Sequence, residues 1–334
     1  MLKIIGNYFL GIFLYTLVII LLADFGRILL KYVFHASWIH SRTAFTVAGA
    51  ICALLILLLS ACGIFHAKYI KTTSYDVIIN KTIPERTSMK VVLLADTHFG
   101  YNAGVLHARE LVRKINKQKP DLVCIAGDIF DNEYDAIRNP EKLEKTLRGI
   151  KSTYGVYACW GNHDLNEEIL AGFTFKHKDG DLSDIKDPRM KKFLKDSNIH
   201  ILKDESVLIN DQFYVIGRKD ASLTEKIHET RKAPAQLTEK LDRDKPIIMI
   251  DHQPKELQEL ADAGVDLDLC GHTHDGQTFP GNFTIKLMWE NPCGLLSKDN
   301  MTNITTSGAG VWGPAMRIGT DSEICSINIQ LKKA

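Results

Sequence analysis

The chain of 334 residues has no excess of charge of either sign, because 41 Lys and Arg stand against 40 Asp and Glu. Proteins that bind a phosphate backbone usually carry a basic excess, so nucleic acid is not expected as a partner. The seven cysteines form no CxxC motif and no paired spacing, and those in apolar runs are expected to be buried, reduced thiols. No P-loop and no GxSxG nucleophile elbow occurs, which excludes two common catalytic designs.

Charge is also missing from two long stretches near the N-terminus, residues 4–23 and 43–65, which consist largely of Ile, Leu, Phe and Val. As a helix, each is long enough to cross the hydrocarbon core of a bilayer, which takes about 20 residues. A cleaved signal peptide is the alternative for the first stretch. That stretch is longer than a typical signal core, lacks a small-x-small site and is followed by a second stretch, so a membrane span is favoured.

These features divide the chain into three parts. We expect a transmembrane helical hairpin over residues 1–67, a linker over 68–88 and one domain over 89–334. Residues 24–42, between the spans, would form either a helix in the membrane interface or a polar turn with anchoring aromatics. The link holds three Lys or Arg, against four on the side of the termini. The count predicts a multi-pass protein of the cell membrane with its domain in the cytoplasm.

Beyond residue 88, short apolar runs alternate with amphipathic segments. Strands are predicted at 90–95, 122–126, 155–160, 247–250 and 267–270, and helices at 106–117 and 141–150. Continuous apolar strands that alternate with helices indicate an α/β fold with sheets buried on both faces. Segments 205–217 and 323–331 resemble antiparallel elements instead. We therefore expect a pair of mixed β-sheets rather than one parallel sheet.

Polar side chains follow five of these strands, where ligands bind in α/β sheets. The five loops read Asp96-Thr-His98, Gly127-Asp128-Ile-Phe-Asp131, Gly161-Asn162-His163-Asp164, Asp251-His252-Gln-Pro254 and Gly271-His272-Thr-His274. In extended backbone, residues two apart point the same way, so the ligands of each DxH or HxH pair can converge. The glycines before Asp128, Asn162 and His272 permit turns or close approach.

Imidazole, carboxylate and amide oxygen together suit Mn, Fe or Zn, and a carboxylate such as Asp128 can bridge two cations. For any single His, a hydrogen-bonded core imidazole is the alternative. Five motifs in one order, each after an apolar run, favour metal ligation for the set.

The ordered motifs DxH, GDxxD, GNHD, a lone His and GHxH resemble those of the calcineurin-like metallophosphoesterase family, from about Lys90 to Leu331. GHTHDGQ at 271–277 and the Gly-rich stretch 308–317 are similar to its membrane-associated branch, although Asp275 stands where that branch often has Gly. The resemblance implies an α/β fold with two mixed β-sheets in a sandwich flanked by helices, and a dinuclear metal centre.

The resemblance also assigns roles to residues. One metal would be held by Asp96, His98, Asp128 and His274. The other would be held by Asp128, Asn162, His252 and His272. His163 would be the catalytic acid, with Asp164 orienting it.

The implied cofactors are two divalent metal ions, Mn²⁺ first, with Fe or Zn as alternatives. The implied enzyme is a metal-dependent phosphoric ester hydrolase that uses hydroxide generated from water, without a covalent intermediate. We expect Asp131 to support a ligand. Arg317 could contact a substrate phosphate, but a surface ion pair is favoured for this residue.

The long polar segment between Asp164 and Ile199 is expected to form a substrate-gating flap, because it leaves directly from the GNHD loop. A membrane hairpin joined to a phosphoesterase predicts two partners, the lipid bilayer and a phosphorylated, lipid-linked substrate with a phosphodiester or pyrophosphate bond. Two alternatives are a cyclic-nucleotide or nucleic-acid phosphodiesterase and a non-catalytic metal-binding membrane scaffold.

Overall fold

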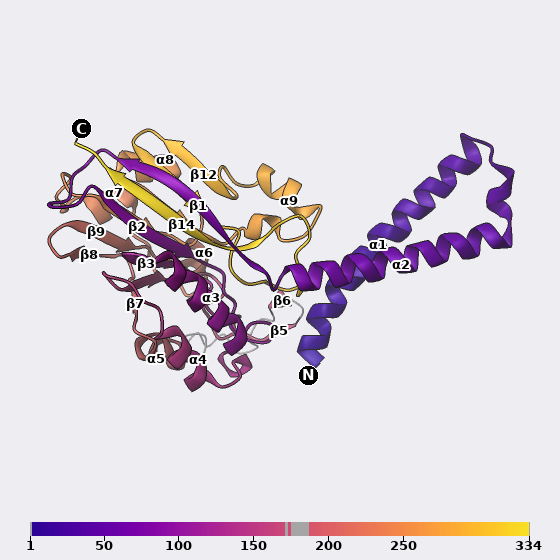
Figure 1. Ribbon diagram of the computed structural model, residues 1–334, viewed down its shortest axis with the longest axis horizontal. Coiled ribbons are helices and arrows are strands. Elements are labelled where there is room, and N and C mark those ends of the chain that lie inside the picture. Colours follow the sequence, from indigo (N-terminus) through magenta and orange to yellow (C-terminus); the bar gives the residue numbers. More distant parts are fainter. Residues whose placement is uncertain (1, 171–172, 175–186, 334) are drawn as a thin grey trace.

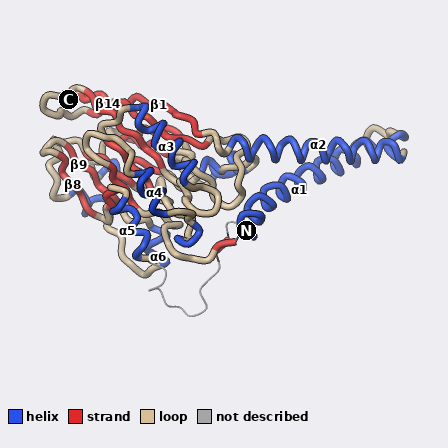
Figure 2. Tube along the Cα trace, turned by 60° about the horizontal axis from the view of Figure 1, so that its bottom comes forward, coloured by secondary structure: helices blue, strands red, loops and turns tan. Residues whose placement is uncertain are grey.

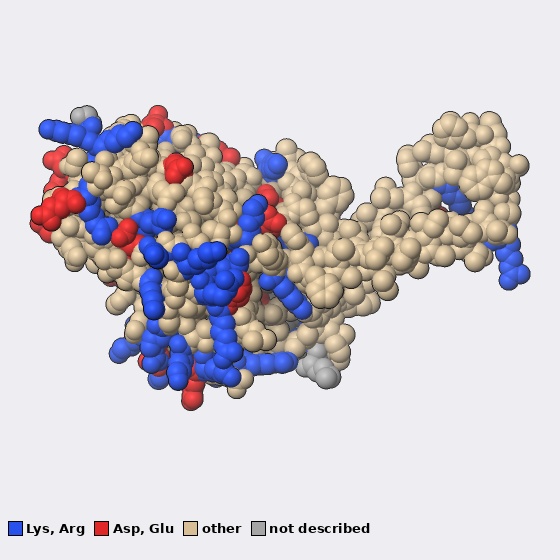
Figure 3. Space-filling model, viewed as in Figure 1, with Lys and Arg blue, Asp and Glu red and all other residues tan. Residues whose placement is uncertain are grey.

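Two long helices project from one end of an α/β domain (Figure 1). The computed structural model describes residues 2–170, 173–174 and 187–333. The helices are α1 (Leu2–Tyr32) and α2 (Arg42–His66), and they contact each other as the predicted hairpin. Both are long and apolar enough to cross a membrane. Lys and Arg are seen on the domain and at the far end of the hairpin, with almost none between (Figure 3).

The segment that joins the two helices is shorter than the predicted link of residues 24–42. Helix α1 continues through Asp24 and Arg27 to Tyr32, and only a short 3₁₀ turn, η1 (Ser37–His40), precedes α2. Ser41 caps α2 by accepting a hydrogen bond from the backbone N–H of Ala44. A Ser at this position satisfies an otherwise unpaired donor, which explains where the helix begins.

The domain is built on two mixed sheets. The first has the strand order β1 (Ile70–Ile79), β14 (Ser322–Leu331), β2 (Ser88–Leu94), β3 (Leu122–Ala126), β4 (Val156–Cys159) and β7 (Ile199–Ile201). The second has the order β12 (Gly294–Lys298), β13 (Met301–Thr305), β11 (Leu267–Cys270), β10 (Ile247–Ile250), β9 (Phe213–Gly217) and β8 (Glu205–Ile209). As predicted, β8 and β9 are antiparallel, and β14 runs antiparallel to β2.

The sheets pack face to face, with helices outside them (Figure 2). Between them lies an apolar core that includes Leu93, Cys124, Ile250 and Leu269. Helices α3 (Val105–Gln118), α4 (Pro140–Leu147) and α5 (Pro188–Asp196) cover the outer face of the first sheet. Helices α7 (Pro234–Thr238) and α8 (Leu257–Asp262) cover the second. The predicted α/β sandwich flanked by helices is confirmed.

Part of the predicted linker is instead a strand of the sheet. All ten residues of β1 pair in parallel with β14, from Ile70 with Ser322 to Ile79 with Leu331. Val77 and Ile79 are buried in the core between the sheets. The polar appearance of 68–88 misled the prediction because β1 is an edge strand, and one of its faces remains exposed.

The predicted flap between Asp164 and Ile199 is only partly described. Residues 171–172 and 175–186, including Lys176 to Asp179, lie outside the described residues. Residues 188–196 form α5, with Met190, Phe193 and Leu194 buried against the sheet. Helix α5 is therefore part of the core and not of a flap.

Candidate metal centre

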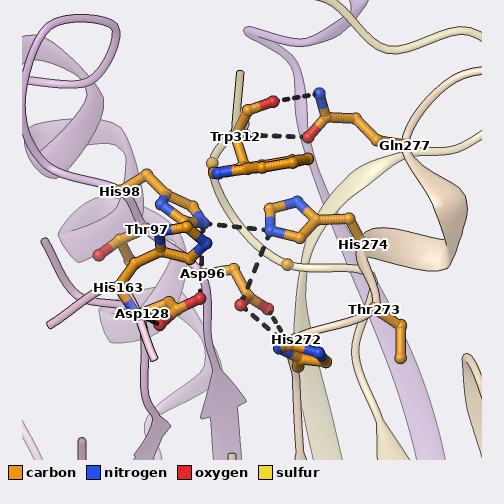
Figure 4. A network of polar contacts seen from close by, with 12 residues as sticks. Asp96, Thr97, His98, Asp128, His163, His272, Thr273, His274, Gln277 and Trp312 are labelled. Carbon is orange, nitrogen blue, oxygen red and sulfur yellow. Dashed lines mark hydrogen bonds and ion pairs between the residues drawn. The ribbon is translucent and has the colours of Figure 1, made fainter. Parts of the chain in front are cut away.

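Five loops meet at one edge of the sandwich, each at the carboxyl end of a strand. The first sheet supplies the loops after β2, β3 and β4, and the second supplies those after β10 and β11. The structure brings together all seven residues predicted as metal ligands: Asp96, His98, Asp128, Asn162, His252, His272 and His274. Residues up to 178 positions apart thus form one cluster (Figure 4).

The cluster contains two groups whose ligand atoms lie within 4.8 Å of one another. The first consists of Asp96, His98 and His274. In it, Nε2 of His98 lies 3.1 Å from Nε2 of His274, which lies 3.7 Å from Oδ1 of Asp96. The second consists of Asp128, His252 and His272.

In the second group, Nε2 of His252 is surrounded by acceptor atoms. It lies 3.0 Å from Oδ1 of Asn162, 3.1 Å from Nδ1 of His272 and 3.2 Å from Oδ2 of Asp128. Asn162 therefore lies where the motif predicts, beside the second group.

Asp128 lies between the two groups. Its Oδ1 accepts a hydrogen bond from the backbone N–H of His163 at 2.7 Å. Its Oδ2 is 3.2 Å from Nε2 of His252 and 4.0 Å from Nε2 of His98. One oxygen is thus held by the protein while the other faces a nitrogen of each group, which is the placement a bridging carboxylate needs.

The donor set fits divalent cations. Nδ1 of His252 donates to the carbonyl of Ala126 at 2.8 Å, so in the neutral ring Nε2 carries a lone pair. That lone pair faces the acceptors of Asn162 and Asp128, and only a proton or a cation between them removes the repulsion. Nitrogen and oxygen donors of this kind suit Mn, Fe and Zn.

Backbone conformation at five of the predicted ligands is unusual. Asp96, His98, Asp128, His272 and His274 all have φ between 44° and 73°, the left-handed region that side chains other than glycine seldom adopt. Such strain persists only where surrounding structure enforces it, and it is concentrated at functional sites.

Glycines let the loops approach closely. A Cβ at Gly161 would lie 2.2 Å from Oδ1 of Asp128, and one at Gly127 would lie 2.6 Å from Nδ1 of His252. The predicted reason for the glycines in GD and GNH, close backbone approach, is confirmed by these distances.

Electrostatics of the buried ligands favour a positive charge at the centre. Burial lowers the pKa of His272 to about 3, and burial holds the pKa of His274 well below its usual value. Both rings are neutral near neutral pH and keep a lone pair for a cation. Burial also lowers the pKa of His252, but Asp128, Asp220 and Asp96 together raise it, so that the net pKa is well above its usual value. The carboxylates thus attract a positive charge to this point.

His163 and Asp164, the predicted catalytic pair, do not contact each other as expected. Asp164 accepts hydrogen bonds from the backbone N–H groups of Phe130 and Gly161, at 2.9 and 2.7 Å, and so ties two ligand loops together. Nδ1 of His163 donates instead to Oδ1 of Asn132 at 2.6 Å. Asn132 directly follows the GDxxD motif. A polar side chain in this strand-end loop was the feature of the sequence from which a partner for His163 could have been predicted.

Asp131 lies where support for a ligand was predicted. Its buried carboxylate is 3.6 Å from Nδ1 of His98, the ring nitrogen that faces away from His274. A carboxylate behind a ligating imidazole sets the orientation of the ring and increases its basicity.

Arg317 is fully buried, so the predicted surface ion pair is wrong. Its Nη2 donates to the carbonyls of Ser307 at 2.6 Å and Gly310 at 2.9 Å, and its Nη1 donates to the carbonyl of His274 at 3.2 Å. The guanidinium therefore holds the Gly-rich loop against the HxH loop and contacts no exposed surface.

A cavity of about 540 Å³ opens beside the cluster. Asp128, His163, His272 and His274 line one part of it, and Ile285, Met288, Trp289 and Trp312 line another. The Trp312 ring lies 5.7 Å from that of His163, and Gln277 fixes the Trp312 backbone by accepting from its N–H and donating to its carbonyl (Figure 4). One cavity thus joins the cluster to apolar side chains, and its volume is large enough for a phosphoryl group.

The hairpin contacts the loop that carries Trp312 and Arg317. The backbone N–H of Ala315 donates to the carbonyl of Asn7, and that of Arg317 donates to the carbonyl of Gly63. The Tyr15 hydroxyl donates to the carbonyl of Phe279 at 2.8 Å. Helices and site are therefore packed together rather than joined by a free linker.

The calcineurin-like phosphoesterase family model matches residues 89–276, more than half of the chain. The chain therefore belongs to this family. It is 32% identical over 257 residues to a metallophosphoesterase of Campylobacter jejuni, covering 74% of this chain and 61% of that one. The chain thus spans about three fifths of the length of that relative.

Two further relatives share the family. A transmembrane protein with metallophosphoesterase domain from Bos taurus is 27% identical, over 84% of this chain and 62% of that one. The UDP-2,3-diacylglucosamine pyrophosphatase of Chlamydia trachomatis is 23% identical, over 74% of this chain and 86% of that one. Among solved structures, a 5'-nucleotidase precursor from Thermus thermophilus matches with a TM-score of 0.42 at 14% identity, over 73% of this chain and 54% of that one.

Proposed function

We propose that this protein is a membrane-tethered, dinuclear-metal-dependent phosphoesterase that hydrolyses a phosphodiester or pyrophosphate bond of a lipid-linked substrate. The observation that carries the proposal is the position of Asp128, with one oxygen facing both ligand groups at the floor of an open cavity. Asp96, His98, Asp128 and His274 would hold one cation. Asp128, Asn162, His252 and His272 would hold the other.

When bound, two divalent cations supply Lewis acidity that makes water a nucleophile near neutral pH and compensates the charge of the phosphoryl oxygens. In the hydrolysis, the oxygen of water bonds to phosphorus, the bond to the leaving oxygen breaks, and the leaving oxygen takes a proton. We assign the delivery of that proton to His163, which lines the cavity. Asn132 keeps the hydrogen of the neutral ring on Nδ1, so that Nε2 is free to exchange protons.

Two features support a lipid-linked substrate. The helices α1 and α2 would hold the cavity at a bilayer surface, where a soluble substrate gains nothing from the tether. One relative is named a UDP-2,3-diacylglucosamine pyrophosphatase, so a nucleotide diphosphate linked to an acylated group is the substrate class to test first.

The test begins with the detergent-purified protein and its metal content. Wild type should bind about two Mn²⁺ per chain and hydrolyse bis(p-nitrophenyl) phosphate. Asp128→Ala should lose metal and activity together. His163→Ala should keep its metal and lose about 10²-fold or more in kcat, the usual contribution of a general acid. Asn132→Ala should lower kcat less, with metal unchanged.

Substrate class is tested by comparing UDP-2,3-diacylglucosamine, a cyclic nucleotide and a phosphomonoester. Preference for the cyclic nucleotide would replace the lipid-linked assignment. Normal turnover by both Asp128→Ala and His163→Ala would refute the assigned centre, and two bound metals without hydrolysis of any probe would favour a scaffold.

A further inference from the structure

An exposed apolar segment borders the cavity of the metal centre. It comprises residues 279–288, including α9 (Gly281–Thr284) and the 3₁₀ turn η4 (Ile285–Leu287). Phe283 is 61% exposed, Leu287 88% and Met288 74%, although residues of these types are usually buried in folded proteins. We call residues 279–288 the platform. Large apolar side chains gathered at this exposure in one segment mark a surface that something covers.

The platform is continuous with the site on one side. Ile285 and Met288 line the same cavity as His272 and His274, together with Trp289 and Trp312. A molecule with its phosphate at the metal ligands would therefore leave the cavity across apolar walls. The side chains of Ile285 and Met288 offer no hydrogen bonds to a sugar or peptide, but they match a hydrocarbon chain.

On the other side the platform is continuous with the hairpin. The carbonyl of Phe279 accepts a hydrogen bond from the Tyr15 hydroxyl of α1. Gly319 lies beside Phe279, and the preceding residue, Ile318, packs on Gly63 of α2. Figure 1 shows α9 on the side of the domain from which the hairpin emerges.

The length of the free hairpin sets the level of the bilayer. From Tyr15 to Tyr32, α1 spans about 25 Å, and from Arg42 to Gly63, α2 spans about 31 Å, at 1.5 Å per residue. The hydrocarbon core is about 30 Å thick, so the free part of α1 leaves no length to spare, and a hairpin that crosses the bilayer brings the domain surface at Tyr15 against it. The platform, which contacts Tyr15, then lies at that surface.

We propose that the platform enters the bilayer surface and receives the hydrocarbon chain of a lipid phosphate whose headgroup occupies the metal centre. This inference rests on the proposed function and specifies how the substrate reaches the site. Lys286 lies within the platform, where an ammonium can meet anionic headgroups while its neighbours enter the acyl region.

The first experiment measures contact with lipid and needs no activity. Leu287→Trp is reconstituted into phosphatidylcholine vesicles with brominated acyl chains, and the fluorescence of the parent protein is subtracted. The control is Leu106→Trp, because Leu106 on α3 is 78% exposed and does not line the cavity. The indole introduced at 287 should lose about half of its fluorescence or more, and the one at 106 should lose none. Equal quenching at both positions, or none at 287, would overturn the proposal, and the latter would favour a protein partner for the platform.

The second experiment measures chain recognition. Decyl phosphate and ethyl phosphate are compared as inhibitors of bis(p-nitrophenyl) phosphate hydrolysis in mild detergent. Wild type should bind decyl phosphate about 100-fold more tightly, since buried methylenes are favourable. Phe283→Ser/Leu287→Ser should reduce this ratio about 10-fold, whereas Leu106→Ser should leave it unchanged. A ratio equal to that of wild type in the double variant would overturn the proposal. Failure of wild type to hydrolyse the diester would refute the proposed function instead, and the quenching result would still decide the platform.

Discussion

Arg317 illustrates how a single residue in this protein acts through others. Its guanidinium is buried, and burial lowers its pKa to about 10. It remains charged at neutral pH, and its donors are used by the carbonyls of Ser307, Gly310 and His274. Arginine suits this position because its planar fork can satisfy several acceptors at once. The residue positions the HxH loop and needs no contact with substrate.

Replacing Arg317 with Met should destabilise the domain by about 3 kcal/mol or more, because three buried carbonyls lose their donors. Metal affinity should also fall, since the backbone of His274 is no longer held. Thermal unfolding and a Mn²⁺ titration measure the two effects. Arg113→Met is the matched control, because its side chain is 62% exposed and pairs with Glu110 on the same helix. A change of under about 0.5 kcal/mol in Arg317→Met, as expected of Arg113→Met, would show that the buried network is dispensable.

At the scale of elements, the hairpin and the Gly-rich loop before β14 behave as one packed unit. Gly11 of α1 faces Met316, and Gly63 of α2 faces Ile318, both so closely that a Cβ would lie under 3.0 Å from the neighbouring side chain. Small residues of this kind let a helix approach another element. Because the same loop carries Trp312 to the cavity, we expect a change in helix packing to reach the candidate metal centre.

Gly63→Leu should therefore shift this loop and lower hydrolysis of the soluble diester, about 10-fold, although residue 63 is remote from the ligands in sequence. Gly49→Leu is the control, because a Cβ at Gly49 has no neighbour within 4 Å. Both variants keep α2 apolar, so the helix should insert into the membrane equally well in both. Activity assays, with limited proteolysis of residues 308–321 as a second readout, compare the two. Equal activities would mean that the hairpin is only a tether.

At the scale of the whole molecule, charge and apolar surface are separated. Residues 1–66 carry four Lys or Arg against one Asp, whereas the remainder is slightly acidic. Arg27, Lys31 and Arg42 lie towards the far end of the hairpin, and Lys3, Lys68, Lys71 and Lys81 lie on the domain side. Cytoplasmic segments carry the greater number of cations near spans, so the domain is predicted to face the cytoplasm.

Labelling by a membrane-impermeant maleimide in intact cells tests this orientation. Trp38→Cys, in the turn between the helices, should react, and Leu106→Cys, on the domain, should react only after lysis. Both side chains are more than 60% exposed, so accessibility within the protein is matched. The parent protein, whose seven cysteines are free, provides the background. Labelling of Leu106→Cys alone would reverse the assigned topology.

The strand-end motifs were predictable because their chemistry is local. Periodicity located β2, β3, β4, β10 and β11, and the residue types after each strand identified the side chains that the structure then brought together as candidate ligands. Two apolar stretches likewise predicted both helices. The hydrogen-bond partners of those residues were harder to predict. Asp164 was expected beside His163, yet Asn132 lies there. Rotamers and loop packing decide which of several neighbouring polar groups makes the contact.

The sequence by itself determined the fold class, the candidate ligand residues and the apolar hairpin, since each depends on residue type and on spacing over a few positions. Only the tertiary structure decided that 70–79 is a strand, because its partner β14 lies some 250 residues later in the chain. It also decided that Arg317 is buried and that residues 279–288 border both the cavity and the hairpin. Contacts between segments distant in the sequence determine which side chains are buried. They decide that Arg317 pairs inside the protein and that Leu287 stays exposed.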